Sequence, residues 1–176
     1  MLLPLSGRDV ALGDAMQNAA TMAFEDQGYP AFELLFEDTE STLGGAKSAA
    51  KNAVQSGSSI VIGPIFADET RAAGIVTAAA GIPMISFSTD TAAIGTNRWI
   101  FGIMPQDQAI AVADHAAEQN LAPDGVLIVA PNTSYGKVIT SSFISRTREL
   151  GIPAHGPIWT EGKTLSHVGE TIKSQG

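Results

Sequence analysis

The sequence contains no cysteine and few aromatic side chains, and its apolar runs are short. Without cysteine the chain cannot hold a disulfide framework, a thiolate zinc site or a cysteine nucleophile; this absence fits the cytoplasm and the periplasm equally well. The run from Val126 to Ala130 is far shorter than the roughly 20 apolar residues of a membrane-spanning helix. We therefore expect a soluble globular protein.

Basic side chains are also scarce. The chain has 10 lysines and arginines against 18 aspartates and glutamates, which gives a formal net charge of -8. The basic residues are scattered along the sequence, whereas a nucleic-acid-binding surface needs them gathered to neutralise a run of phosphates. The charge pattern therefore excludes nucleic acid as the main partner.

The usual signatures of catalysis and cofactor binding are missing. The segment Gly44-Gly45-Ala46-Lys47 lacks the ending of a phosphate-binding loop, and no dinucleotide fingerprint or serine nucleophile elbow occurs. The acidic run Glu37 to Glu40 could hold a metal, but its place at a strand end favours an exposed turn and helix cap. We predict no catalytic residue, no cofactor and no metal. The competing enzyme hypothesis, a flavodoxin-like or Rossmann-like sheet, predicts a bound flavin or nicotinamide.

Short apolar runs alternate with amphipathic stretches along the whole chain, a pattern typical of an α/β fold with parallel sheets flanked by helices. The expected strands are Leu2 to Leu5, Phe32 to Phe36, Ser59 to Ile62, Pro83 to Phe87, Trp99 to Ile103, Val126 to Ala130 and Ile152 to Trp159.

Helices are expected between these strands, with alanine-rich faces that pack on the sheet. The predicted inward residues of the first helix are Leu12, Ala15, Met16, Ala19, Met22 and Ala23. Those of the second helix, which Ser41 or Thr42 caps and Gly57 ends, are Leu43, Ala46, Ala50, Ala53 and Val54. Those of the third, from about Asp68 to Ala80, are Ala72, Ile75, Val76 and Ala79. A fourth helix begins after Pro105 and a fifth near Tyr135.

Met104-Pro105 is the predicted boundary between two lobes, because an extended strand there meets a proline and a new helix begins. We expect an N-terminal α/β lobe over residues 1–104 and the first part of a second α/β lobe over residues 105–176. The chain begins as if inside a buried strand and ends in a predicted helix, Ser166 to Gly176. We therefore expect a truncated chain from which a signal or lipoprotein leader has been removed.

In open parallel sheets, ligands bind at the carboxyl ends of the strands, where helix N-termini offer free N–H groups. The loops in that position are rich in small and hydroxyl-bearing residues, which suit both helix capping and a ligand site lined by backbone. They are Ser6-Gly7-Arg8, Asp38-Thr39, Gly63 to Asp68, Ser86 to Thr91 and, in the second lobe, Pro131 to Tyr135.

An ordered series of short segments resembles the leucine/isoleucine/valine-binding family of type I periplasmic binding proteins. The segments are Leu2 to Gly7 with Ala11-Leu12-Gly13, Phe36 to Thr39, Val61 to Pro64, Gly81 to Ser86 and Phe101 to Asp107. The resemblance implies two α/β lobes that close on a ligand in the cleft between them, in a periplasmic protein that hands a small polar solute, such as an amino acid, to an ABC transporter permease.

Family members that bind amino acids hold the carboxylate with two first-lobe loops, which correspond here to 65–67 and 86–90. Ala67 stands where the family has a serine, and Asp90 stands where it has a threonine. Asp90 either faces the ligand carboxylate, which it would repel, or caps the turn that begins at Thr91. The ligand-binding residues that the resemblance and the strand-end rule predict are Ser6, Phe66, Ala67, Ser86, Ser88, Thr89 and Tyr135, with Phe66 and Tyr135 as apolar walls.

A second branch of the same fold is also similar. Phe101-Gly102, Pro105 to Gln108, Pro131-Asn132 and Tyr135 to Val138 resemble the corresponding domain of outer-membrane lipoproteins that activate peptidoglycan synthases. In that branch the partner is a penicillin-binding protein. Gly102 also fits this branch, because amino-acid binders commonly have an arginine at that position. Either resemblance implies that the protein meets the membrane only peripherally, through lipidation or a permease.

Overall fold

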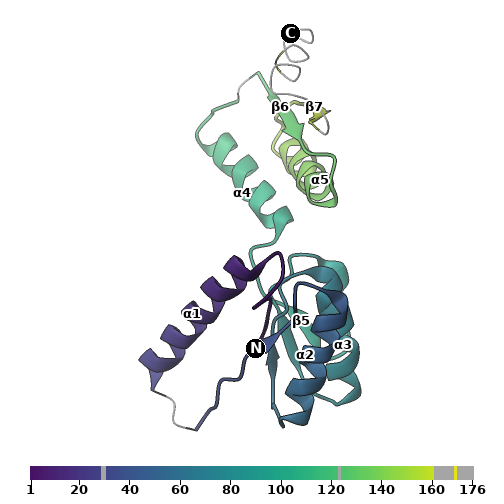
Figure 1. The fold of residues 1–176 in the computed structure, drawn as a ribbon. Helices are drawn as coiled ribbons and strands as arrows, with labels where there is room; N and C mark the ends of the chain where they lie inside the picture. Colours follow the sequence, from purple (N-terminus) through teal and green to yellow (C-terminus); the bar gives the residue numbers. More distant parts are fainter. Residues whose placement is uncertain (29–30, 123, 161–168, 170–176) are drawn as a thin grey trace. The chain divides into compact units, whose positions relative to one another are not determined.

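The computed structural model describes residues 1–28, 31–122, 124–160 and 169. The chain divides into two compact units, Met1–Gly102 and Ile103–Gly176 (Figure 1). The sequence placed the boundary between residues 104 and 105, two residues further along the chain. The predicted helix from Ser166 to Gly176 lies outside the residues that the structure describes, apart from Gly169.

The first unit alternates strands and helices. Its elements are β1 (Leu2–Leu3), α1 (Val10–Gln27), β2 (Glu37–Asp38), α2 (Leu43–Gln55), β3 (Val61–Ile62), α3 (Ala67–Ala79), β4 (Met84–Ser86), the short 3-10 helix η1 (Thr91–Ala93) and β5 (Arg98–Ile100). Strands β1 and β2 pair in parallel, and β3, β4 and β5 form a parallel sheet in that order. The predicted α/β class with parallel sheets and flanking helices is confirmed.

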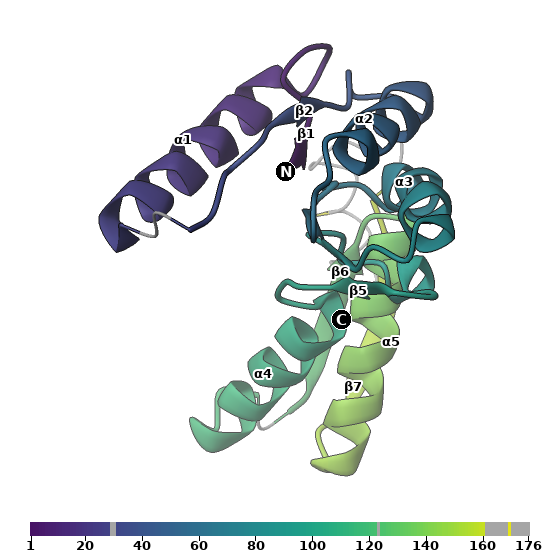
Figure 2. The same ribbon diagram turned by 90° about the horizontal axis from the view of Figure 1, so that it is seen from below.

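The core of this unit lies between the strands and the helix pair α2 and α3, which run side by side in both views (Figures 1 and 2). Its buried residues are Leu2, Ala49, Ala50, Ala53, Val61, Ala73 and Met84. Alanine on the helices allows a close approach to the strands, which supply the larger side chains. The predicted inward face of α2 is confirmed at Ala46, Ala50 and Ala53, whereas Leu43 is exposed.

Of the predicted inward residues of α1, only Met16 is half-buried, and the other five are exposed. Gly13 is its one buried residue, and the half-buried positions continue from it along Met16, Ala20 and Phe24, while Met22 is 65% exposed. A Cβ at Gly13 would lie 2.0 Å from the Pro4 carbonyl oxygen, so the glycine is where the helix touches the strand end. Apolar spacing could not show this contact, because glycine carries no apolar side chain.

The predicted face of α3 is only partly right: Val76 packs against the core and Ala72 is half-buried, but Ile75 and Ala79 are exposed. The helix buries Glu69, Thr70, Ala73, Gly74 and Thr77, and the predicted inward residue Ile75 is 68% exposed. The buried threonines bond their hydroxyls to carbonyls of their own helix, Thr70 to Phe66 at 2.8 Å and Thr77 to Gly74 at 3.4 Å. Because those bonds satisfy the hydroxyls, polar side chains occupy a face that the hydrophobic pattern assigned to solvent.

Two predicted strands are shifted. Phe32 to Phe36 is not a strand; β2 begins at Glu37, where Leu2 and Leu3 provide its partners. The strand predicted from Trp99 begins one residue earlier and ends at Ile100, where pairing with β4 stops. Apolar composition indicated both regions of the chain, but the residues that pair are those opposite β1 and β4.

The second unit contains α4 (Pro105–Glu118), β6 (Val126–Ala130), α5 (Ser134–Glu149) and β7 (Ala154–Trp159). Strands β6 and β7 pair in parallel, and α4 packs on α5. An ion pair joins these helices, from Arg146 Nε to Asp114 Oδ1 at 2.6 Å. Leu127 and Val129 lie on one face of β6 and are 40% and 42% exposed.

Candidate functional site

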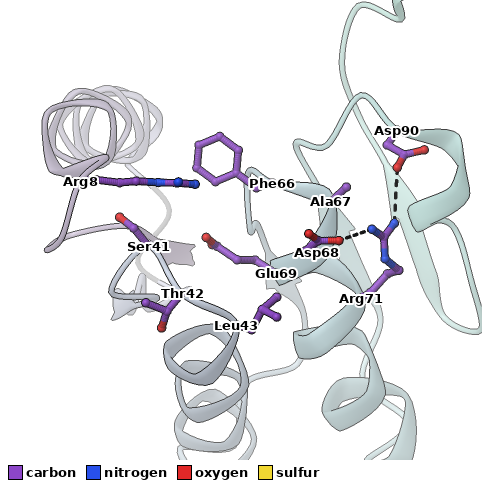
Figure 3. Close-up of a pocket in the computed structure, with 10 residues that line it drawn as sticks. All are labelled: Arg8, Ser41, Thr42, Leu43, Phe66, Ala67, Asp68, Glu69, Arg71 and Asp90. Atoms are coloured by element: carbon purple, nitrogen blue, oxygen red, sulfur yellow. Dashed lines mark hydrogen bonds and ion pairs between the residues drawn. The ribbon is translucent and has the colours of Figure 1, made fainter. Parts of the chain in front are cut away.

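A pocket of about 380 Å³ opens at the carboxyl ends of the strands in the first unit (Figure 3). It is lined by Arg8, Ser41, Thr42, Leu43, Phe66, Ala67, Asp68, Glu69, Arg71 and Asp90. These residues come from the β1–α1 loop, the first turns of α2 and α3, and the loop after β4. This is the edge of the sheet at which the strand-end rule places a ligand, and the volume suits a small molecule.

Asp38 holds the loops at one side of the pocket together. Its Oδ1 accepts the backbone N–H groups of Leu5 at 2.9 Å, Ser6 at 3.1 Å and Glu40 at 2.7 Å. Burial raises the pKa of the Asp38 carboxyl, but these bonds and one from the Ser6 hydroxyl outweigh burial and lower that pKa. Asp38 is therefore a charged anchor for the loop that carries Arg8. The acidic run is not the exposed turn that the sequence predicted, because Glu37 and Asp38 form β2 and only Glu40 lies in a turn.

Ser41 and Thr42 fix the N-terminus of α2 beside that loop. The Ser41 hydroxyl donates to the Ser6 carbonyl at 3.0 Å and accepts the Asp9 N–H at 3.2 Å. Thr42 Oγ1 accepts the Gly45 N–H at 2.9 Å, which confirms Thr42 as the predicted cap. The Thr42 hydroxyl thus satisfies one N–H of the first turn of α2, and Leu43 is 55% exposed at the pocket wall.

The N-terminus of α3 has no such cap. Its N-cap residue Phe66 is extended, with φ -95° and ψ 148°, and offers no side-chain hydrogen bond. The first helical bond runs from the Thr70 N–H to the Phe66 carbonyl at 2.9 Å. The N–H groups of Ala67 and Asp68 precede that bond and carry the partial positive charge of a helix start. An anionic group entering the pocket can accept them.

Ser86 and Ser88 lie behind this helix start and are only 0% and 2% exposed. Ser86 Oγ donates to the Pro64 carbonyl at 2.8 Å, accepts the Ser88 N–H at 3.0 Å and lies 2.6 Å from Thr70 Oγ1. Ser88 Oγ accepts the Asp90 N–H at 3.1 Å. Internal bonds therefore occupy both hydroxyls, and the pair ties the end of β4 to the first turn of α3.

Charges around the pocket mouth are mostly compensated. Arg71 pairs with Asp68 and, through NH1, with Asp90 Oδ2 at 3.4 Å. Asp90 Oδ1 accepts the Ala92 N–H at 2.9 Å and so caps η1, which decides between the two roles that the sequence left open for Asp90. Because Arg71 shares its charge, Asp90 is a weaker obstacle to an anionic ligand than the sequence alone indicated.

Glu69 lies deepest among these charged residues, with 4% of the residue exposed. Its carboxyl points toward Arg8 and Ser41 (Figure 3), and Oε2 has no hydrogen-bond partner. The pKa of the Glu69 carboxyl is raised, and burial is the largest cause. The neighbouring Thr39 hydroxyl and Arg8 lower this pKa, whereas Asp9 raises it further. Thr39 Oγ1 also has no hydrogen-bond partner, so the Thr39 hydroxyl and Glu69 Oε2 are both unpaired although the two residues are neighbours.

The structure brings only part of the predicted ligand set to the pocket. Phe66 and Ala67 line it, whereas Ser6, Ser86 and Ser88 support the loops behind it. Thr89 is exposed outside the lining, and Tyr135 belongs to the second unit. Sequence reasoning missed Ser41, Thr42, Leu43, Glu69 and Arg71; Arg8 and Asp68 lay in strand-end loops that it singled out.

The described residues show neither a group of three potential metal ligands nor a helix long and apolar enough to cross a membrane. A comparison with proteins of curated function found no match.

Comparison with solved structures found chains of the same fold. A leucine binding protein from Thermotoga maritima is 21% identical with a TM-score of 0.68, and the match covers 98% of this chain and 52% of that one. A branched-chain amino acid transporter substrate binding protein from Streptococcus pneumoniae, in complex with isoleucine, is 26% identical with a TM-score of 0.69 and the same coverage. A solute binding protein of an ABC transporter from Rhodopseudomonas palustris, in complex with 3,4-dihydroxybenzoic acid, is 17% identical with a TM-score of 0.70, over 99% of this chain and 50% of that one.

The chain thus spans about half the length of these structures. A family model described as periplasmic binding protein matches residues 1–170, nearly the whole sequence. With the parallel α/β fold and the pocket at the strand ends, this match shows that the chain belongs to the periplasmic binding protein family.

Proposed function

We propose that the protein captures a small polar solute that carries a carboxylate, an amino acid or a related acid, for uptake by an ABC transporter. The observation that carries this proposal is the uncapped N-terminus of α3, which opens on the pocket with the N–H groups of Ala67 and Asp68. Leucine, isoleucine and dihydroxybenzoic acid are the compounds named with the three similar structures, and a carboxylate is the one functional group that all three share.

In this proposal the carboxylate accepts the free N–H groups of the first turn of α3, and Phe66 forms the apolar wall beside it. Ala67 has no hydroxyl to add a further bond, so affinity rests on backbone donors. Ser86, Ser88 and Ser6 act by holding the loops in place, and Thr89 and Tyr135 remain predicted contacts. The proposed compartment is the periplasm, with a permease as the membrane partner.

The direct test is Ala67→Pro, which removes the Ala67 N–H as a donor and places the ring carbon Cδ where that hydrogen was. Ala67 is the first helical residue, a position where proline is favoured because its fixed φ fits and its missing N–H has no helical partner. The extended Phe66 already has the conformation that a residue before proline prefers. We therefore expect an unchanged or slightly raised stability.

Binding is measured by calorimetry against the twenty amino acids, the acids that lack their α-amine, and the matching carboxamides. We expect carboxylates to bind the unaltered chain and Ala67→Pro to weaken them roughly tenfold, as for one hydrogen bond to a charged group. Carboxamides should bind weakly to both proteins. Equal binding of acids and carboxamides, or an affinity indifferent to the proline, would contradict the proposal.

None of the similar structures named above is described as an activator of a peptidoglycan synthase. Affinity capture from an envelope extract separates the two partners: a permease supports solute uptake, and a penicillin-binding protein without a permease overturns it.

A further inference from the structure

The Glu69 carboxyl and the Thr39 hydroxyl are neighbouring groups that the fold leaves unpaired. Glu69 is 4% exposed and lines the pocket, and Thr39 is 0% exposed. Neither Glu69 Oε2 nor Thr39 Oγ1 has a hydrogen-bond partner. Buried polar atoms in folded proteins are nearly always paired, so an unpaired carboxyl at a pocket wall needs an explanation.

The Thr39 hydroxyl can pair with Glu69 in either of its two charge states. The terminal torsion of glutamate is broad, so a small rotation is enough to pair Oε2 with Oγ1. A hydroxyl accepts a hydrogen bond from a protonated carboxyl and donates one to a carboxylate. Gain or loss of the proton therefore changes the charge of this wall of the pocket without displacing the side chain.

The charged residues of the β1–α1 loop do not hold Glu69 in its ionised form. Arg8 attracts the carboxylate, but Arg8 Nε pairs with Asp9 Oδ2 at 2.9 Å and the Arg8 side chain is 76% exposed. Asp9 repels the carboxylate. Burial is the largest influence and raises the pKa of Glu69 above the ordinary value of 4.5, so the carboxyl ionises at a pH above that value.

The other charged residues of the pocket are paired among themselves. Arg71 pairs with Asp68 and, at 3.4 Å, with Asp90. Residues 41–43, which line the pocket from the start of α2, carry no charge. Of the residues that line the pocket, all of which the structure describes, Glu69 is thus the one charged residue without an ion pair.

An anion at the start of α3 and an ionised Glu69 oppose each other. Glu69 is the third residue of the helix, and Ala67, whose N–H group the proposed carboxylate accepts, is the first. A negative charge in the first turn also offsets the partial positive charge that attracts the anion. Across a small pocket with an effective dielectric constant near 20, two like charges weaken binding roughly 10- to 100-fold. Because linkage is reciprocal, the bound anion in turn favours protonation of Glu69.

We propose that Glu69 is a pH-sensitive switch for the pocket: its protonated form admits an anionic solute, and its ionised form disfavours one. This inference rests on the proposed function and adds regulation to it. The solute is held more tightly at lower pH and is released more readily as the pH rises through the range in which Glu69 ionises.

The test uses two carboxylates without an amine, 4-methylpentanoate and 3,4-dihydroxybenzoate, and calorimetry on the 176-residue chain. Measurements run from about pH 5.5 to about pH 8, where such carboxyl groups are ionised. We expect the affinity of the unaltered chain to fall about tenfold or more over this range. Glu69→Gln is neutral at every pH and close to glutamate in size, so its affinity should stay nearly constant. Other titrating groups are the same in both proteins, so the difference between the two profiles belongs to Glu69.

Glu40→Gln is the matched control, because it removes one negative charge from an exposed residue in the loop before α2. It should keep the pH profile of the unaltered chain. If the profiles of the unaltered chain and Glu69→Gln coincide, or if affinity rises with pH, the inference is overturned while carboxylate binding stands. If neither probe binds at any pH, the inference fails, and the wider panel of acids decides separately whether the proposed function stands.

A second measurement needs no variant. Calorimetry at one pH, in buffers of different ionisation enthalpy, reports the protons exchanged on binding. Because the bound anion favours the protonated carboxyl, the unaltered chain should take up a proton with the probe wherever Glu69 is otherwise ionised. Proton release, or no exchange anywhere in the range, would refute the assignment.

Discussion

Replacing Ser86 by alanine tests whether this buried hydroxyl is a structural support or a free ligand contact. The substitution removes one oxygen that three groups share: the Pro64 carbonyl, the Ser88 N–H and the Thr70 hydroxyl. Two of these keep other partners, since the Pro64 carbonyl also accepts the Phe87 N–H at 2.9 Å and the Thr70 hydroxyl donates to the Phe66 carbonyl at 2.8 Å. The Ser88 N–H loses its acceptor inside a buried site.

The cost follows from that one orphaned donor. A buried N–H without a partner costs about 1 to 3 kcal/mol, and Ser→Ala leaves almost no cavity, so we expect Ser86→Ala to lower the free energy of unfolding of the first unit by about 2 kcal/mol. Ser88→Ala is the matched comparison. It frees the Asp90 N–H, which belongs to an exposed residue and can bond to water, so about 0.5 kcal/mol or less is expected.

Urea unfolding followed by tryptophan fluorescence measures both values. Trp99 lies on β5, which pairs with β4, whereas Trp159 lies in the second unit, so a Trp159→Phe background makes the signal specific for the first unit. The slope against urea should stay constant, which shows that only stability changed. If Ser86→Ala costs less than about 0.5 kcal/mol, or no more than Ser88→Ala, the structural role given to this hydroxyl is wrong.

Two further predictions concern the glycines at the start of α2 and the carboxyl of Glu69. A Cβ at Gly45 would lie 2.2 Å from the Thr39 carbonyl oxygen, whereas one at Gly44 meets nothing within 4 Å. Gly45→Ala should therefore destabilise the first unit by about 1 to 3 kcal/mol, and Gly44→Ala should stabilise it by up to about 1 kcal/mol, in the same unfolding assay; equal effects would contradict the close approach of α2. Glu69 gives a pH signature, because burial raises its pKa above 4.5, so its stabilising contribution is complete below that pH and is lost as the pH rises through the folded-state value. Unfolding midpoints measured from about pH 4 to pH 7.5 should show Glu69→Gln gaining stability relative to the unaltered chain as the pH rises; parallel curves would show that the carboxyl is not buried in solution.

The sequence by itself determined the class of fold and the edge at which a site would lie. Alternating apolar runs and helical stretches predict parallel sheets with flanking helices, since each pattern has one way to bury its apolar face. The caps at Thr42 and Gly57 were also readable, because a capping hydroxyl and a left-handed glycine act over a few residues; Gly57 has φ 75°. The strand-end rule also selected the loops that carry Arg8, Phe66, Ala67 and Asp68, because each of these loops directly follows a predicted strand.

Only the tertiary structure decided which side chains face inward and which hydroxyls are free. The buried face of α1 is set by Gly13, which has no side chain, and that of α3 includes Thr70, whose hydroxyl is bonded within its own helix. Apolar spacing detects neither residue. Ser86 and Phe66 both suited a ligand site, yet the packing of α3 against β4 buried the first and left the second at the pocket. Glu69 came to the pocket wall in the same way, because burial and the lack of a partner depend on residues distant in the sequence, and no local pattern contains them.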